Sequence, residues 1–249
     1  MVHYKYISYD QIKCSDDSKG VGGWWFAEAP RYIFHYANVP YDEILINLKN
    51  FTVYDSAWSH EFPILISDGQ VLTNSMKISR HLAKQFGLNG KDDWEAAEIN
   101  QFAEFHRDLF TILGTYMLPK IGLSQEADSF KSVFYENMDK YFPTYIKKLE
   151  ESESGFLSKS GVSWIDFMVA NHMWAVRKVA SETMKKKYPT LLSHAERVFA
   201  LPEIKDFVDK DKKRYNMNEV IPEVFDLQEK REMNGSVVDN KVPEIVLAA

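Results

Sequence analysis

The segment from His60 to Ser75 combines residues that can hold an extended, negatively charged ligand. Asn74-Ser75 stands before a helical pattern. The start of a helix favours anions, because its first N–H groups have no partners within the helix and lie at the positive end of its dipole. Since proline donates no hydrogen bond to a sheet, we expect Pro63 at the first position of a strand, with backbone groups left free to pair with an extended peptide. The alternative is an ordinary hairpin packed under a helix that Asn74 merely caps.

The elements that must position these residues are two short strands, a turn and a helix. The apolar runs Ile64–Ile66 and Val71-Leu72 predict the strands. Asp68-Gly69 between them predicts a tight turn, because both residues tolerate positive φ. The pattern from Met76 to Phe86 predicts the helix. Upstream, the chain predicts a strand at 4–9, a loop at 10–23, a helix at 24–38, a strand at 41–48 and a loop at 50–61.

The rest of the chain shows helical patterns. Gly87–Asp93 is a helix stop followed by polar residues, and we place a domain boundary there. The first helix after it is apolar on one face, which includes Ile112. Ser163 and Asp166 can form a capping box at the start of a helix that is apolar on nearly all faces. The predicted helices cover 94–116, 127–151, 162 onward, 183–201 and 202–215. The prediction is therefore two domains at 1–88 and 94–215, a linker at 89–93 and a tail at 216–249.

Composition and charge argue against several classes of protein. A net charge of −6 over 249 residues argues against nucleic-acid binding, which depends on basic surfaces. The single cysteine, Cys14, allows neither an intrachain disulfide nor a thiolate metal cluster. No metal-ligand spacing joins the histidines, which include His60, His81, His106 and His172. No apolar run is long enough to span a bilayer, and nothing near the start resembles a signal peptide. We therefore expect a soluble cytoplasmic protein with no nucleic-acid or membrane partner.

Five stretches follow one another along most of residues 26–170. They are A-E-A-P-R-Y-I-F-H-Y-A-N-V-P-Y-D-E, F-P-I-L-I-S-D-G, N-S-M-K-I-S-R-H-L-A-K, G-L-N-G-K-D-D and S-W-I-D-F. Their order resembles the cytosolic glutathione S-transferase family, nearest to its sigma class, the class of haematopoietic prostaglandin D synthase. The resemblance implies an α/β thioredoxin-like N-terminal domain followed by an all-α helical-bundle C-terminal domain. It also implies a homodimer that conjugates glutathione to a small hydrophobic electrophile, or uses it to isomerise one, in detoxification.

The resemblance assigns the reacting hydroxyl to the end of the first strand. Tyr9 would be the catalytic tyrosine, whose hydroxyl donates to the glutathione sulfur and favours the thiolate. A long insertion at residues 10–25 replaces a short Arg-Gly turn of the family. Ser8 or Tyr6 therefore stays open as the group that faces the sulfur, and some classes of the family use serine.

The remaining contacts with glutathione follow from the same resemblance. The backbone of Phe62, before Pro63 with a cis bond, would pair with the cysteinyl part like an added strand. Asn74 and Ser75 would hold the γ-glutamyl carboxylate. Asp108 would reach across the dimer interface to the γ-glutamyl amine of glutathione bound by the other subunit.

Three positions depart from the family pattern. Phe51 replaces the tryptophan that contacts the glycyl end of glutathione, and it cannot donate a hydrogen bond. The lysine expected near Tyr54 or Asp55 is absent, so the glycyl carboxylate loses a charged partner. Glu61 replaces a glutamine, and its charge would repel the carboxylates of glutathione. These departures predict weaker or altered glutathione binding, and they support a second hypothesis: a transferase-like protein with a binding or structural role.

Overall fold

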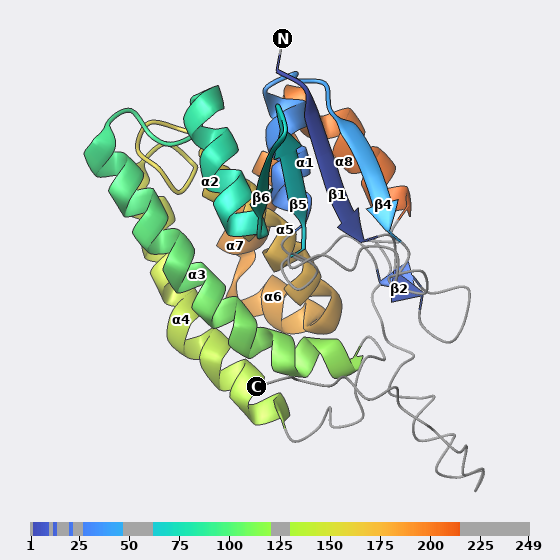
Figure 1. Cartoon of the computed structure of the whole chain (residues 1–249). Coiled ribbons are helices and arrows are strands. Elements are labelled where there is room, and N and C mark those ends of the chain that lie inside the picture. The colour runs from blue at the N-terminus through green and yellow to red at the C-terminus, as the bar shows by residue number, and fades with distance from the viewer. Residues whose placement is uncertain are drawn as a thin grey trace, which may run out of the picture.

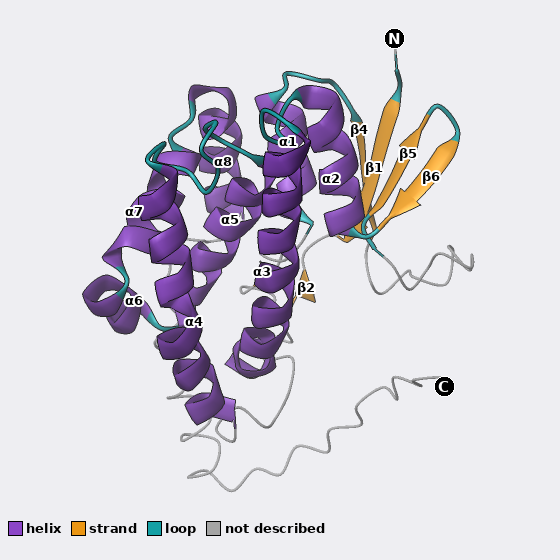
Figure 2. Cartoon of the chain, turned by 90° about the vertical axis from the view of Figure 1, so that its left-hand side faces the viewer, coloured by secondary structure: helices purple, strands orange, loops and turns teal. Residues whose placement is uncertain are grey.

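The computed structural model describes residues 2–9, 12–13, 20–21, 27–46, 62–120 and 130–214 of the chain. Phe51 and Glu61 lie outside the described residues, and so do the side chain of Tyr9, the loop predicted at 50–61 and the tail predicted at 216–249. The described part consists of a layer of strands beside eight helices (Figure 2).

Four strands form the main sheet in the order β4-β1-β5-β6 (Figure 1). β4 runs parallel to β1, whereas β5 is antiparallel to β1 and β6 is antiparallel to β5. The strands are β1 (Tyr4–Tyr9), β4 (Asp42–Ile46), β5 (Ile64–Ser67) and β6 (Gln70–Thr73). A separate pair joins β2 (Ile12–Lys13) to β3 (Gly20–Val21), within the segment predicted as a loop. The pair was not predicted, because two residues are too few to show a period of two.

The turn between β5 and β6 has the predicted conformation. Ser67 pairs with Gln70, which leaves two residues in the turn. Both have positive φ, 47° at Asp68 and 81° at Gly69. Two consecutive positive φ values define the type I′ turn, whose twist matches that of the flanking strands. The turn therefore fixes the register of the hairpin and delivers the chain to the helix that follows.

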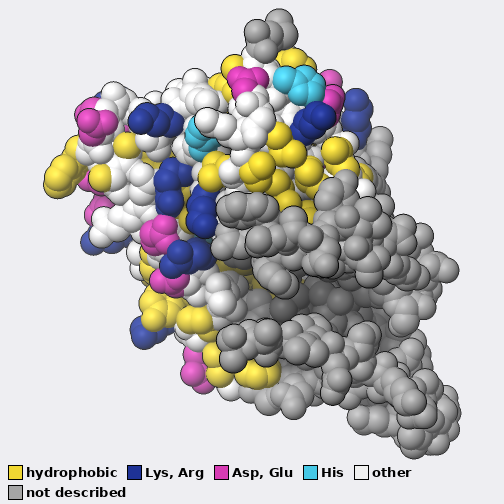
Figure 3. All heavy atoms as spheres, in the orientation of Figure 1, with side chains coloured by type: hydrophobic (Ala, Val, Ile, Leu, Met, Phe, Trp, Pro, Cys, Tyr) yellow, Lys and Arg dark blue, Asp and Glu magenta, His cyan; other side chains and the backbone are white. Residues whose placement is uncertain are grey.

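Two helices, α1 (Glu28–Tyr36) and α2 (Ser75–Phe86), lie on the same side of the sheet (Figure 2). The core between them and the strands contains Tyr4, Tyr6, Ile33, Phe34, Leu65, Ile78 and Leu82, all buried. The opposite face carries a smaller cluster around Ile7 and Ile64. Hydrophobic side chains gather over the strands on this face in Figure 3. The sheet therefore has a helix-covered face, which holds Tyr4 and Tyr6, and an opposite face, which holds Ile7.

The helical part begins at α3 (Asp93–Lys120), which is longer than predicted. The other helices are α4 (Lys131–Ser152), α5 (Trp164–Val179), α6 (Ser181–Lys187), α7 (Pro189–Phe199) and α8 (Pro202–Arg214). The apolar face of α3 is not buried throughout, since 38% of Ile112 is exposed. α5 is buried on nearly all faces, as predicted, and contacts α1, α3 and α7.

The single helix predicted at 183–201 is wrong. The chain forms α6 and α7 there, and Tyr188 between them has φ −129° and ψ 44°. Pro189 explains the break, because proline lacks an N–H group and pushes the preceding residue out of the helical region.

The predicted capping box at the start of α5 is confirmed. The Asp166 carboxylate accepts from the Ser163 backbone N–H at 2.8 Å and from Ser163 Oγ at 2.7 Å. The same carboxylate accepts from Leu157 N and His194 Nε2, both at 2.8 Å. The box therefore also ties the preceding loop and α7 to the buried helix. Within the described ranges, no helix has the length and apolar character needed to cross a bilayer.

Candidate functional site

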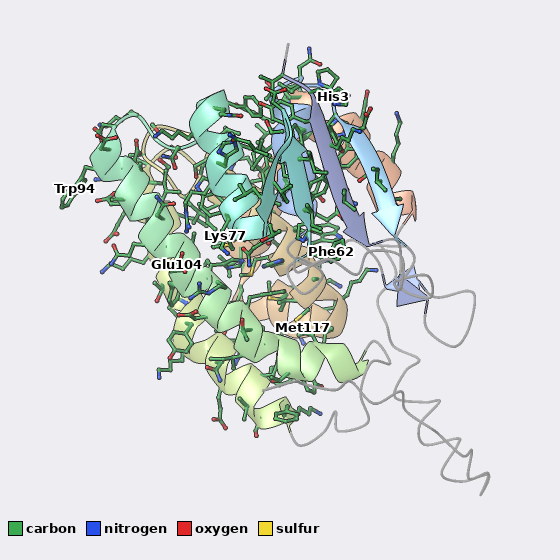
Figure 4. All side chains as sticks on the ribbon, in the orientation of Figure 1. His3, Phe62, Lys77, Trp94, Glu104 and Met117 are labelled. Atoms are coloured by element: carbon green, nitrogen blue, oxygen red, sulfur yellow. The ribbon has the colours of Figure 1, made fainter. Side chains whose placement is uncertain are left out.

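Strand register brings most of the predicted site residues to one end of the main sheet. Ile7 pairs with Ile64, so the next residues of β1, Ser8 and Tyr9, lie beside the chain that enters β5. Ile64 also pairs with Thr73, which leads directly into α2. Phe62 lies at this end of β1 and β5, and Lys77 lies at the adjacent end of α2 (Figure 4). Three separate segments therefore meet where the first strand ends.

The Phe62-Pro63 segment enters β5 as predicted, with a cis peptide bond. The backbone groups of this segment were expected to be free of hydrogen bonds within the sheet. The Pro63 carbonyl accepts a hydrogen bond from Asn74 N at 3.0 Å, so the expectation that this group stays free is wrong. The reason is that the β5–β6 hairpin continues by one more pair beyond Ile64 and Thr73. This bond ties the X-Pro segment to the start of α2.

The start of α2 is capped by Asn74. Its Oδ1 accepts from Met76 N at 3.0 Å and Lys77 N at 3.4 Å, and its backbone has φ 73° and ψ 125°. Ser75, the first helical residue, is buried. Asn74 thus caps α2, and two of the first helical N–H groups already have an acceptor. The donors left at this position for an anion are the Asn74 amide nitrogen and the polar groups of Ser75.

Ser8 lies on the helix-covered face of β1, since side chains alternate along a strand and Tyr4 and Tyr6 face α1 and α2. It is fully buried, and its Oγ accepts from Arg31 Nη2 at 2.5 Å. Tyr6 is also fully buried, and its hydroxyl donates to the Ala27 carbonyl at 2.6 Å. The Tyr6 hydroxyl therefore already donates its proton within the fold, which argues against it as the reacting hydroxyl.

Arg31 is the centre of a buried charged cluster that the sequence did not reveal. Its guanidinium contacts the carboxylates of Glu28 on the same helix and Glu43 on β4. It also lies over the ring of Tyr6, 5.5 Å from the ring centre. Burial raises the pKa of Tyr6 well above its ordinary value, despite the opposing charge of Arg31. The Glu-x-x-Arg spacing at 28–31 was a visible signal for one of these pairs, whereas the contacts with Ser8 and Glu43 join different elements.

Asp108 comes from α3, a helix of the helical part. It is exposed on α3, and Arg107 Nη2 donates to its Oδ1 at 2.8 Å. Its predicted role concerns a second copy of the chain, so it stays a prediction.

Three polar side chains form an unpredicted chain of hydrogen bonds in the core of the helical part. Tyr145 on α4 lies 2.8 Å from His106 Nδ1 on α3, and His106 Nε2 lies 2.7 Å from His172 Nδ1 on α5. Phe110 stacks on His172. Burial lowers the pKa of His106 to about 3. No group of three potential metal ligands occurs among the residues that the structure describes.

A surface cavity of about 420 Å³ lies at the other end of the sheet, around the β5–β6 turn and the second half of α2. Its lining includes Val2, Asp68, Val71, His81 and Gln85. None of the predicted site residues lines it, so we do not assign the site to this cavity.

The chain resembles known proteins in sequence and in fold. A family model described as "Glutathione S-transferase, C-terminal domain" matches residues 108–211. "Probable glutathione S-transferase 7" of Caenorhabditis elegans is 31% identical over 212 residues, which cover 84% of this chain and 97% of the relative. The crystal structure of a major nematode-specific glutathione S-transferase of C. elegans has a TM-score of 0.73 at 28% identity, covering 84% of this chain and 97% of its own. Monomeric Na-GST-3, from the hookworm Necator americanus, has the same fold, with a TM-score of 0.73 at 24% identity and the same coverage.

These likenesses confirm the predicted fold, an α/β thioredoxin-like domain followed by an all-α helical domain. The sheet with α1 and α2 forms the first part, and α3 to α8 form the second. The domain limits at 88 and 94 and the linker between them stay predictions.

Proposed function

Because the chain belongs to the glutathione S-transferase family of enzymes, we propose that it transfers glutathione to a small hydrophobic electrophile, or uses glutathione to isomerise one. One observation carries this proposal. The end of the main sheet joins a hydroxyl of β1, the Phe62-Pro63 segment and the capped start of α2. These three parts suit the sulfur, the backbone and the terminal carboxylate of one extended tripeptide.

Each part of the site would contribute a different interaction. The backbone of Phe62 would pair with the cysteinyl part of glutathione like an added strand. Asn74 and Ser75 would hold the γ-glutamyl carboxylate, using the Asn74 amide nitrogen because Asn74 Oδ1 already caps α2. A hydroxyl at the end of β1, from Ser8 or Tyr9, would donate to the sulfur.

The proposed reaction needs little covalent chemistry from the protein. A hydrogen bond donated to sulfur favours the thiolate, which is the nucleophilic form of a thiol. The thiolate then attacks the electrophile, and in a conjugation the leaving group departs with the electron pair of the broken bond. The protein contributes by holding the thiolate and the electrophile in position.

Several finer assignments belong to the same proposal. We propose a sigma-like class, from the order of the five sequence stretches. We also propose a cytoplasmic homodimer with a role in detoxification, in which Asp108 contacts glutathione bound by the other subunit. Phe51 would lie at the glycyl end of glutathione, and Glu61 would lie beside Phe62.

A binding or structural role without catalysis is the alternative. Glu61 and the missing lysine near residues 54–55 favour it, since both weaken the hold on the carboxylates of glutathione. The Pro63 carbonyl and Asn74 Oδ1 already accept hydrogen bonds within the fold, which leaves fewer groups for a ligand and also favours the binding or structural role.

Glutathione binding and turnover test the proposal directly. We expect retention on immobilised glutathione and conjugation of a generic aryl halide. Ser75→Ala should raise the KM for glutathione about tenfold, because it removes a hydrogen bond to a charged group. Ser79→Ala is the matched control on the same helix: Ser79 Oγ is buried and has no hydrogen-bond partner within the described structure, so KM should not change. Neither retention nor turnover, in protein shown to be folded, would overturn the proposal in favour of the binding role.

A further inference from the structure

We propose that Ser8 supplies the hydroxyl that faces the glutathione sulfur, and that Arg31 is a positioning residue that sets this hydroxyl as a hydrogen-bond donor. This inference rests on the proposed function and deepens it. The sequence pattern did not pair Arg31 with Ser8, because Arg31 comes from α1 and Ser8 comes from β1. The two are joined only in the folded structure.

The guanidinium of Arg31 is held at three points. Its Nη1 donates to Glu28, its Nε donates to Glu43 and its Nη2 donates to Ser8 Oγ. A planar group with three such bonds has little freedom to turn, and only 2% of the Arg31 side chain is exposed. The position of the Ser8 oxygen is therefore fixed by α1 and β4 as well as by its own strand.

The direction of the Arg31–Ser8 bond decides what Ser8 can do. Guanidinium has no acceptor, so Ser8 Oγ must accept from it. The hydroxyl then has its own proton to donate to another group. An acceptor such as a thiolate sulfur suits this proton, and donation to the charged form stabilises it. Arg31 thus orients Ser8 as a donor.

The charge of the cluster argues against a direct electrostatic role for Arg31. Among the described residues, the guanidinium of Arg31 lies against two carboxylates, those of Glu28 and Glu43. These negative charges oppose the attraction of the guanidinium for a thiolate, so we place the contribution of Arg31 in the hydroxyl of Ser8. This conclusion makes the inference testable, because the effects of changing Arg31 and Ser8 should not add.

The place of Ser8 along β1 fits this role, although its side chain is buried in the structure. It lies one residue beyond Ile7, at the end of β1 beside the Phe62-Pro63 segment. It also lies on the helix-covered face, the side on which α2 begins. The hydroxyl and the capped helix start are therefore on one side of the sheet.

The test measures the pKa of the glutathione thiol when bound, from the ultraviolet absorbance of the thiolate as pH is changed. Ser8→Ala should raise this pKa by about one pH unit, since it removes one hydrogen bond to a charged group. Arg31→Lys keeps the positive charge near Glu28 but loses the planar guanidinium and its donor to Ser8. It should raise the pKa of the bound thiol by a similar or smaller amount. The double variant should match Ser8→Ala alone. Arg80→Lys is the control. It removes a guanidinium that donates to Asn100 and Glu104 rather than to Ser8, so it should leave the pKa of the bound thiol unchanged.

Glu43→Gln is a second variant that tests the same role if Arg31→Lys does not fold. Glu43 is more exposed than Glu28, so the change loosens Arg31 without placing a new defect in the core, and it should raise the pKa by less than Arg31→Lys does. Additive shifts in the double variant would overturn the positioning role. An unchanged pKa in Ser8→Ala would assign the sulfur contact to another group, such as Tyr9. Failure of the unchanged protein to bind glutathione would instead overturn the proposed function itself.

Discussion

Two buried polar clusters of this chain differ in charge: one contains charged side chains that pair with each other, and the other contains neutral side chains. The cluster at the end of the sheet keeps its charges, because the guanidinium of Arg31 contacts the carboxylates of Glu28 and Glu43. The cluster in the helical part avoids charge. There, burial lowers the pKa of His106 to about 3, and burial together with His106 lowers the pKa of His172 well below its usual range.

The difference between the clusters indicates what each is for. A buried ion pair costs much desolvation energy and is weak evidence for stability. Its place beside Ser8, where the site residues meet, points to a role in the site. The neutral chain from Tyr145 through His106 to His172 joins α4, α3 and α5. Satisfied hydrogen bonds of this kind fix how helices pack, so this cluster is structural.

The largest effect should come from removing the charge of Arg31. Arg31→Met leaves the carboxylate of Glu28 in a site where only 2% of its side chain is exposed. Breaking a buried pair in this way should lower the free energy of unfolding by about 3–5 kcal/mol. Denaturant unfolding measures the loss. Arg80→Met is the matched control, because 34% of the Arg80 side chain is exposed, and it should cost about 1 kcal/mol or less.

A second substitution makes this prediction sharper. Adding Glu28→Gln to Arg31→Met removes the buried negative charge and should recover part of the lost stability, since neutral replacements of both partners are tolerated better than removal of one. If the double variant is no more stable than Arg31→Met, the charge of Glu28 is not what makes the cluster sensitive.

Acid should affect the histidine cluster next most strongly. His106 and His172 are buried as neutral rings, so the unfolded chain binds protons that the folded chain rejects. Their contribution to stability is complete above a pH near 6.5, the unfolded pKa, and falls as the pH drops below it. At pH 5 the lowered pKa of His106 should cost about 2 kcal/mol, from about 1.5 pH units at about 1.4 kcal/mol each.

Substitution separates this effect from the titration of carboxylates. His106→Gln should reduce the loss of stability between pH 7 and pH 5 by about 2 kcal/mol, measured as the difference from the unchanged protein. His81→Gln, at an exposed position on α2, should leave that loss unchanged. An equal pH dependence in His106→Gln and the unchanged protein would mean that the buried rings do not control the response to acid.

The sequence was informative where structure depends on neighbours along the chain. The turn at Asp68-Gly69, the cap at Asn74 and the box of Ser163 with Asp166 each involve residues within four positions, and each was confirmed. The break at Pro189 carried the same kind of local signal, but the apolar spacing of residues 183–201 was given more weight than the proline.

Both polar clusters depend instead on residues far apart along the chain. Arg31 and Ser8 are 23 positions apart, and His106 and His172 are 66 apart. Neither pair shows in spacing, because helix and strand periods relate only near neighbours. The sequence therefore predicted the local structure of β5, β6 and α2, but it did not show that Arg31 lies beside Ser8.

Asn74 should give the smallest effect on stability, because it serves backbone groups at a partly exposed position. Asn74→Ala removes the cap of α2 and should cost about 1 kcal/mol. Asn74→Asp keeps the capping oxygen, so stability should hold, yet its charge would oppose the γ-glutamyl carboxylate and raise the Kd for glutathione. Thermal unfolding and calorimetric titration of the two variants separate the roles. If Asn74→Asp binds glutathione as tightly as the unchanged protein, Asn74 is a cap alone, and the carboxylate must be held elsewhere.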